Sequence, residues 1–326
     1  MRHWFTRSPG ALRPLAARTA GKGLAPSRRT HRAALGFVVL LAGWLMACAD
    51  AERAALPGPP PAPGSPARVI AIAPAIVETL YVLGLEDRVV GVGDFAAWPP
   101  EVAEKPRIGG LFDPRLETIA GLEPDLAILL VSERGLEEPL ARLGVEVMLL
   151  EVESVAEVAE AIAAIGERMG VEARAEAFLA GWWSGLEPDS LGADEERPRI
   201  LLSIVRDAGR LSAVLTANRE TFYQELLDNL GAENVFAEAP VLYPQVAAEE
   251  IVARRPSVVI ELQPRPLDAP AADRLLADWE TVPFATTPCT RVVGGAHTLL
   301  PGPRLPELYR DLRAAVADCL DEVPGT

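Results

Sequence analysis

Short apolar runs alternate along the chain with segments of helical periodicity. Runs typical of buried strands cover residues 68–73, 89–92 and 125–131, with short helices predicted between them. The same alternation resumes at residue 199 after a polar stretch. Strands that alternate with helices favour largely parallel sheets covered by helices on both faces. The pattern therefore predicts two α/β lobes.

One part of this pattern occurs twice. Residues 117–128 and 249–260 each read as a short helix that a proline stops, followed at once by an apolar strand. In this alignment Glu117 matches Glu249, and both glutamates fall in a first helical turn, where a carboxylate suits the helix dipole. The repeat predicts similar lobes that each present one acidic residue for docking. The alternative is that both are ordinary surface glutamates.

Residues 154–186 are predicted to be helical with one break at Gly170. Ser154 and Glu157 have the spacing of a capping box. The second half of this segment leads out of the first lobe and would form a stiff connector. We expect an α/β fold of two Rossmann-like lobes with a central cleft, bridged by a single long α-helix. The expected boundaries are 68–170 for the N-terminal lobe, 171–190 for the connecting helix and 191–326 for the C-terminal lobe.

The N-terminus has the pattern of an export signal. A basic region precedes an apolar run of about fifteen residues, which is shorter than the ~20 that a membrane-spanning helix needs. The run ends in Leu45-Met46-Ala47-Cys48, which resembles a bacterial lipobox. This predicts a signal peptide over 1–47, lipidation of Cys48 and a Pro-rich tether over 48–67. An uncleaved anchor helix is the alternative, and both place the body outside the cytosol.

Charge and cysteine content restrict the range of possible functions. Residues 1–47 hold eight basic residues and no acidic ones, so the rest has 23 basic residues against 46 acidic ones, a formal charge of −23. So acidic a body argues against nucleic-acid binding. Cys289 and Cys319 could pair in an oxidising compartment or remain buried thiols. No Cys/His cluster has metal-site spacing.

Several features together resemble a known family, the helical-backbone substrate-binding proteins of ABC importers, which capture cobalamin, iron-siderophores and haem. The residues that carry the resemblance are Ile72-Ala-Pro74, Glu78-Thr-Leu80, Leu83-Gly84-Leu85, Val90-Gly91-Val92, Trp98-Pro-Pro100, Gly109-Gly110, Leu116-Glu117, Glu123-Pro124-Asp125-Leu126, and Gly231 with Glu233-Asn234-Val235-Phe236. The resemblance covers about residues 68–320.

The resemblance implies an architecture and a partner. Two lobes would flank a ligand cleft, and Glu117 and Glu249 would pair with arginines of a permease dimer that carries ATPase subunits. Charge-assisted contacts of this kind fix register and speed encounter. The protein would be a monomer, held to the membrane by lipid in the periplasm or another extracytoplasmic space.

Within the family the sequence is most similar to cobalamin-binding members. Tyr243-Pro244-Gln245-Val246 and Trp98-Pro99-Pro100 match aromatic-Pro runs of those proteins, so both aromatic residues would contact a large flat ligand. Phe112 stands one position from an expected aromatic residue. His297 stands where an aspartate–aromatic pair is usual, and it could contact the ligand or be an ordinary loop residue. Haem or a ferric siderophore is the alternative ligand; no cofactor is expected.

A metal enzyme of the chelatase type is the alternative from another class, since two-lobed α/β folds also host such enzymes. The sequence has no Gly-rich phosphate loop, nucleophile elbow or metal-ligand cluster. A binding protein is therefore the favoured prediction.

Overall fold

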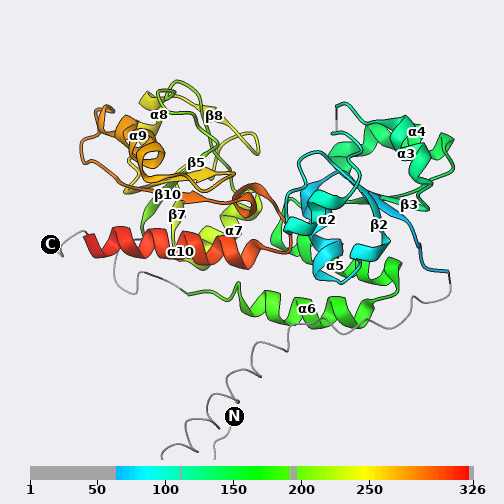
Figure 1. The fold of residues 1–326 in the computed structure, drawn as a ribbon. Helices are drawn as coiled ribbons and strands as arrows, with labels where there is room; N and C mark the ends of the chain where they lie inside the picture. Colours follow the sequence, from blue (N-terminus) through cyan, green and yellow to red (C-terminus); the bar gives the residue numbers. More distant parts are fainter. Residues whose placement is uncertain (1–63, 111, 190, 192–196, 323–326) are drawn as a thin grey trace, which may run out of the picture. The chain divides into compact units, whose positions relative to one another are not determined.

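The computed structural model describes residues 64–322, apart from residues 111, 190 and 192–196. Its strands form two sheets, one from each half of the described chain (Figure 1). Both sheets lie within one compact unit. The predicted signal peptide, the lipidation site at Cys48 and most of the tether lie outside the described residues.

The first sheet has four parallel strands in the order β2-β1-β3-β4. Its strands are β1 (Val69–Ala71), β2 (Val89–Val92), β3 (Leu126–Leu130) and β4 (Glu146–Leu150), and its helices are α2 (Pro74–Val82), α3 (Leu116–Leu122) and α4 (Glu137–Arg142), with 3₁₀ turns η1 (Glu86–Arg88), η2 (Pro100–Glu104) and η3 (Val131–Leu136). Val69 and Ala71 pack on the α2 side, whereas Ile70 packs with Ile119 and Leu140 of α3 and α4. Both faces are buried, as in most parallel sheets.

The second sheet is mixed, in the order β10-β9-β5-β6-β8, with β7 also paired to β5. Its strands are β5 (Arg199–Ile204), β6 (Val214–Leu215), β7 (Glu233–Asn234), β8 (Gln245–Val246), β9 (Val258–Gln263) and β10 (Cys289–Gly294), and its helices are α7 (Phe222–Asn229), α8 (Ala248–Arg254), α9 (Ala269–Glu280) and α10 (Leu305–Glu322), with the 3₁₀ turn η4 (Ala296–Leu299). Strands β5, β7, β9 and β10 are parallel, and β6 and β8 are antiparallel to their neighbours. The two-lobed α/β fold class is confirmed.

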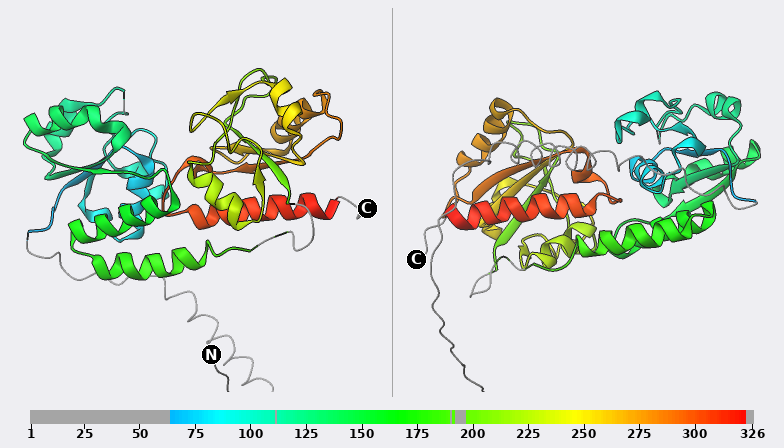
Figure 2. Two further views of the ribbon diagram at one scale, coloured as in Figure 1. Left: turned by 180° about the vertical axis from the view of Figure 1, so that it is seen from behind. Right: turned by 60° about the horizontal axis from the view of Figure 1, so that its bottom comes forward.

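In sequence order, two helices follow the first sheet and precede the second: α5 (Val155–Met169) and α6 (Glu172–Ser184). Both run side by side in Figures 1 and 2. The predicted capping box is confirmed, because Ser154 Oγ accepts from the Glu157 amide and Glu157 Oε2 accepts from the Ser154 amide. Gly170 ends α5 with a φ of 68°, which glycine adopts without strain. The predicted break at Gly170 is therefore confirmed, and α6 lies within the predicted connecting segment, residues 171–190.

The two lobes share one hydrophobic core. The largest buried cluster includes Val69 of β1, Ile162 of α5, Ile200 of β5 and Leu308 of α10. Backbone contacts also cross between the lobes, since the Phe222 amide donates to the Glu153 carbonyl oxygen at 2.7 Å. Shared burial of this kind opposes large relative movements of the lobes.

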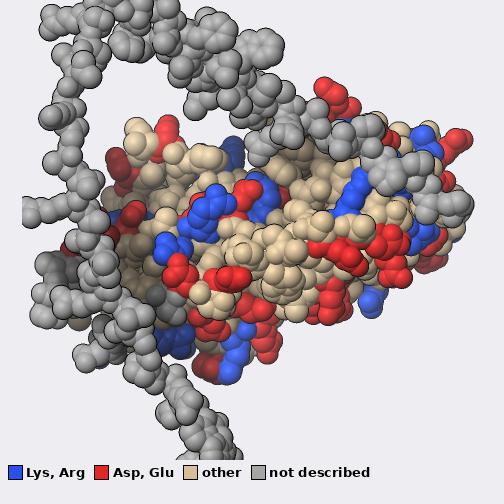
Figure 3. Space-filling model, turned by 90° about the horizontal axis from the view of Figure 1, so that it is seen from below, with Lys and Arg blue, Asp and Glu red and all other residues tan. Residues whose placement is uncertain are grey.

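The last helix is tied to the second sheet. A disulfide joins Cys289 of β10 to Cys319 of α10, with Cα atoms 5.7 Å apart. No helix among the described residues is long and apolar enough to cross a membrane. Acidic side chains are widespread on the face shown in Figure 3, in keeping with the negative charge of the chain.

Candidate ligand-binding and docking sites

The carboxyl ends of parallel strands are the usual place for a ligand in open α/β sheets. Loops that begin there carry most of the exposed large apolar side chains of the described residues. The members of this group are Phe95 after β2, Phe112 before α3, Val205 after β5, and Val241 and Tyr243 before β8. Such exposure is costly in water, and its concentration in both lobes indicates a binding surface.

Phe95 and Phe112 belong to two adjoining loops of the first lobe. Their exposed fractions are 81% and 96%. A side chain at Gly110, between the loops, would lie 3.7 Å from Phe95. Arg115 links the loops by donating to both carboxylate oxygens of Asp94, at 3.2 and 2.8 Å. The rings are thus presented from a braced backbone.

Trp98 has a different setting from these two rings. It is half-buried, and the guanidinium carbon of Arg304 lies 4.7 Å from the centre of its ring. Trp98 also lines a pocket of about 310 Å³ with Tyr81, Pro99 and three further residues. Its ring therefore packs beside α2 as well as towards solvent.

Tyr243 lies in the second lobe and is 37% exposed. Burial raises its pKa, and the negative charge of Glu153, its hydrogen-bond partner in the segment between β4 and α5, raises it further. The hydroxyl therefore remains protonated at neutral pH. Tyr223 behind it is buried, and its hydroxyl donates to the Thr298 carbonyl oxygen at 2.7 Å. Tyr243 thus joins residues of both lobes.

His297 is buried rather than exposed in a loop. It lies in η4, and its Nε2 is 2.8 Å from Asp311 Oδ2 of α10. That nitrogen already has a partner, so a direct ligand contact requires the other ring nitrogen. Of the four predicted ligand residues, His297 has the setting least suited to the role. No group of three or more His, Cys, Asp or Glu that could hold a metal is found among the described residues.

Phe95, Val205 and Val241 belong to this exposed apolar group but were not among the predicted ligand residues. Phe95 could have been included, because it precedes Trp98 in the same loop. Val205 gave no signal: it has a φ of 50°, which branched side chains rarely adopt, at the end of β5. Arg206, which follows it, is buried in ion pairs with Glu261 and Asp278. This buried network holds the strained residue at the surface.

Glu117 and Glu249 occupy matching places in the two lobes. Each is exposed in the first turn of a seven-residue helix, α3 or α8. Neither carboxylate has an ion-pair partner within the part of the chain that the structure describes. Both are therefore available to a partner's cations, as the docking prediction requires.

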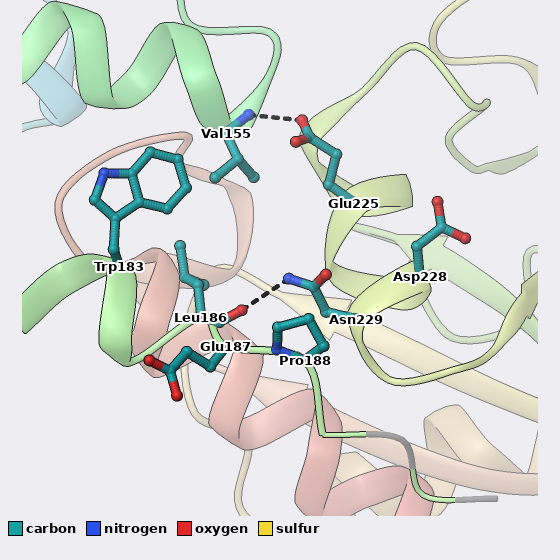
Figure 4. Close-up of a pocket in the computed structure, with 8 residues that line it drawn as sticks. All are labelled: Val155, Trp183, Leu186, Glu187, Pro188, Glu225, Asp228 and Asn229. Atoms are coloured by element: carbon teal, nitrogen blue, oxygen red, sulfur yellow. Dashed lines mark hydrogen bonds between the residues drawn. The ribbon is translucent and has the colours of Figure 1, made fainter. Parts of the chain in front are cut away.

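A separate pocket of about 500 Å³ lies where the connection meets the second lobe (Figure 4). Glu225 of α7 accepts there from the Val155 amide of α5 at 2.7 Å, and Asn229 donates to the Leu186 carbonyl oxygen at 2.8 Å. None of the predicted ligand residues lines it. We assign it to the junction rather than to a ligand.

Each lobe thus presents exposed aromatic side chains near its strand ends. The family model described as "Periplasmic binding protein" matches residues 69–278. The chain belongs to the periplasmic binding protein family, and is thus a substrate-binding protein of the ABC-transporter class and not an enzyme.

Similar proteins include the vitamin B12-binding protein of Salmonella choleraesuis, 27% identical over 199 residues, which are 59% of this chain and 71% of that protein. An uncharacterized ABC transporter substrate-binding lipoprotein of Bacillus subtilis is 26% identical over 60% of this chain and 63% of that protein. Among solved structures, a periplasmic haem-binding protein of Pseudomonas aeruginosa has a TM-score of 0.65 and 25% identity, covering 78% of this chain and 93% of that one.

Proposed function

We propose that this protein captures cobalamin or a related corrinoid between its lobes and delivers it to a membrane permease. The observation that carries the proposal is the group of exposed apolar side chains at the strand ends of both lobes, Phe95 and Phe112 in the first, Tyr243 in the second. A large flat ring system gains from stacking and desolvation against such rings. The similarity to vitamin B12-binding proteins supports this ligand.

Haem is the second candidate. The fold similarity to a haem-binding protein supports it, at an identity close to that of the B12-binding relative. Haem would present the same flat apolar face to these rings, but its propionates would need cations. A ferric siderophore would depend still more on cations than on aromatic rings.

Docking would use Glu117 and Glu249. Their matched positions suit the two halves of a permease dimer associated with ATPase subunits. One glutamate on each lobe would let the permease contact both lobes at once. Charge-assisted pairs of this type set register and association rate.

Lipid at Cys48 would tether the body to the membrane, with residues 48–67 as an extended spacer. The relative named as a lipoprotein supports this part. Mass spectrometry of protein from bacterial membranes would test this. A chain that begins at Cys48 and carries a diacylglycerol on its thiol is expected. A chain that still carries the residues before Cys48 would contradict the proposal.

Calorimetric titration of the full chain in mild detergent would test the ligand. Cyanocobalamin, haemin and a ferric siderophore should be compared, together with the variant Phe95→Ala/Phe112→Ala. Saturable one-to-one binding of cyanocobalamin that the double variant weakens by about tenfold is expected. Binding of haemin alone would favour the second candidate. Absence of binding by all three would refute both.

A further inference from the structure

The two lobes meet in a buried ion pair that joins residues 226 positions apart. Glu78 lies in the middle of α2 in the first lobe, and Arg304 immediately precedes α10 in the second. Arg304 Nε and Nη2 donate to the two carboxylate oxygens of Glu78, at 3.0 and 2.7 Å. The side chains are only 2% and 9% exposed. The pair is therefore bidentate and almost completely removed from water.

Arg304 makes a second contact with the first lobe through the flat face of its guanidinium. This face lies over the ring of Trp98, at 4.7 Å from the ring centre. Within its own lobe, Arg304 forms an ion pair with Glu307 at a longer distance of 3.6 Å. A residue of the second lobe is thus held mainly by the first.

The backbone beside Arg304 is shaped for this approach. A side chain at Gly302 would lie 3.1 Å from the β-carbon of Ala75 in α2, closer than most such contacts. Glycine therefore lets the start of α10 approach α2 at this point. The local sequence and the ion pair favour the same arrangement of the two lobes.

The geometry limits how the lobes can move. A bidentate guanidinium–carboxylate pair is strongly directional, and separating it would leave two uncompensated charges in a dry environment. Any rotation of one lobe must break this pair, or else move Arg304 relative to the Trp98 ring. The arrangement of the lobes and the position of this ring are therefore coupled.

We propose that Arg304 is a positioning residue, which fixes the two lobes in one arrangement and holds the Trp98 ring in place for the ligand. The second half of this statement rests on the proposed function. Lysine could not replace Arg304, because a single ammonium group cannot make the two parallel bonds or lie flat on the ring.

Hydrogen exchange of the full chain tests the first half without any ligand. Arg304→Lys and the near-isosteric Glu78→Gln should accelerate exchange about tenfold in residues 75–82 and 303–309, while the sheets remain protected. Arg313→Lys is the matched control, since Arg313 also lies on α10 but pairs with Asp189 at the exposed surface. Unchanged exchange in both junction variants would overturn the lobe-fixing role. Circular dichroism shows whether each variant folds. If either Arg304→Lys or Glu78→Gln fails to fold, the hydrogen exchange of the other variant tests the lobe-fixing role.

A double-mutant cycle tests the second half. Arg304→Lys should weaken binding of the ligand found by titration by about tenfold in the native background, but by less than about twofold in Trp98→Leu. Equal weakening in both backgrounds would show that Arg304 acts on the ligand site without Trp98, and the positioning role would be wrong. If the native chain binds none of the three compounds, the proposed function fails, whereas the exchange experiment still decides the lobe-fixing role.

Discussion

The two copies of the sequence repeat fold in the same way down to their caps. Helices α3 and α8 both end at a non-glycine residue in the left-handed conformation, Glu123 at a φ of 46° and Arg255 at 50°. A proline and a buried parallel strand follow each. In the first lobe Arg68, directly before β1, donates to the carbonyl oxygens at the end of α3. In the second lobe Arg199, at the start of β5, donates in the same way to the end of α8. One structural unit is thus used once in each lobe.

The copies differ at their other ends. In the first lobe Arg115, directly before α3, binds Asp94 and so joins the helix that carries Glu117 to the loop that presents Phe95. The matching residue before α8 is Ala247, which has no side chain able to form such a link. A common framework therefore presents both glutamates, but only the first copy connects its glutamate helix to an aromatic loop in this way. Under the proposed function, ligand contact and docking would be more directly linked in the first lobe.

The largest effect, on ligand uptake, is expected from the two matched glutamates. Glu117→Arg/Glu249→Arg should reduce ligand uptake in cells by about 100-fold, because like charges would face the permease cations. Ligand affinity of the purified double variant should be unchanged. Each single variant should retain part of the activity if both lobes dock.

The matched control is Glu176→Arg, which reverses an exposed glutamate on α6 outside the repeat. Uptake should be close to that of the native protein. If the control is equally impaired, the loss comes from overall charge; if ligand affinity falls instead, the two glutamates serve the ligand site and not docking.

The next largest effect, on the free energy of unfolding, is expected from the arginines that cap α3 and α8, and it should differ between the two copies. Arg199→Ala should lower the free energy of unfolding by about 2 kcal/mol and Arg68→Ala by about 1 kcal/mol, because charged donors to carbonyl oxygens are lost in both. The loss is larger in the second lobe since Arg199 is less exposed and also pairs with Glu233. Urea unfolding followed by circular dichroism measures both.

Arg142→Ala is the control for these caps, because Arg142 forms an exposed pair with Glu138 and should cost no more than about 0.5 kcal/mol. A cost for Arg68→Ala or Arg199→Ala no greater than that of the control would show that the guanidinium caps contribute nothing beyond surface pairing.

The sequence predicted the repeated unit because its signals are local: a proline, an apolar run and a glutamate at fixed spacing. The capping box at Ser154 was predictable for the same reason. By contrast, the pairing of Glu78 with Arg304 joins residues far apart in the chain and had no local signal. His297 was predicted as a candidate ligand contact in a loop, and its pairing with Asp311 could not be foreseen, because Asp311 lies on a helix that packs against it only in the folded chain.

The smallest expected effect on stability concerns two buried carboxylates, one near each repeat strand. Glu261 in β9 accepts hydrogen bonds from the Arg206 guanidinium and the Trp279 indole. Glu133, after β3, accepts only from the Leu130 amide among the described contacts. Burial raises the pKa of Glu133 above its ordinary value of 4.5, against the effect of that one hydrogen bond. Burial also raises the pKa of Glu261, against the opposing effects of Arg206, Ser203 and Trp279. Glu133 is therefore the carboxylate with fewer compensating contacts.

This difference predicts a pH dependence. Between 4.5 and the raised pKa of Glu133, the folded protein keeps a proton that the unfolded chain releases, so stability falls as pH rises through this window. Glu133→Gln, which can still accept the Leu130 amide, should remove this part of the slope and raise the free energy of unfolding at pH 7 by up to about 1 kcal/mol. Glu137→Gln, at an exposed neighbouring position, is the matched control in the same urea-unfolding series. An identical slope in Glu133→Gln and the native protein would show that burial does not raise the pKa of Glu133, and the predicted pH dependence would be wrong.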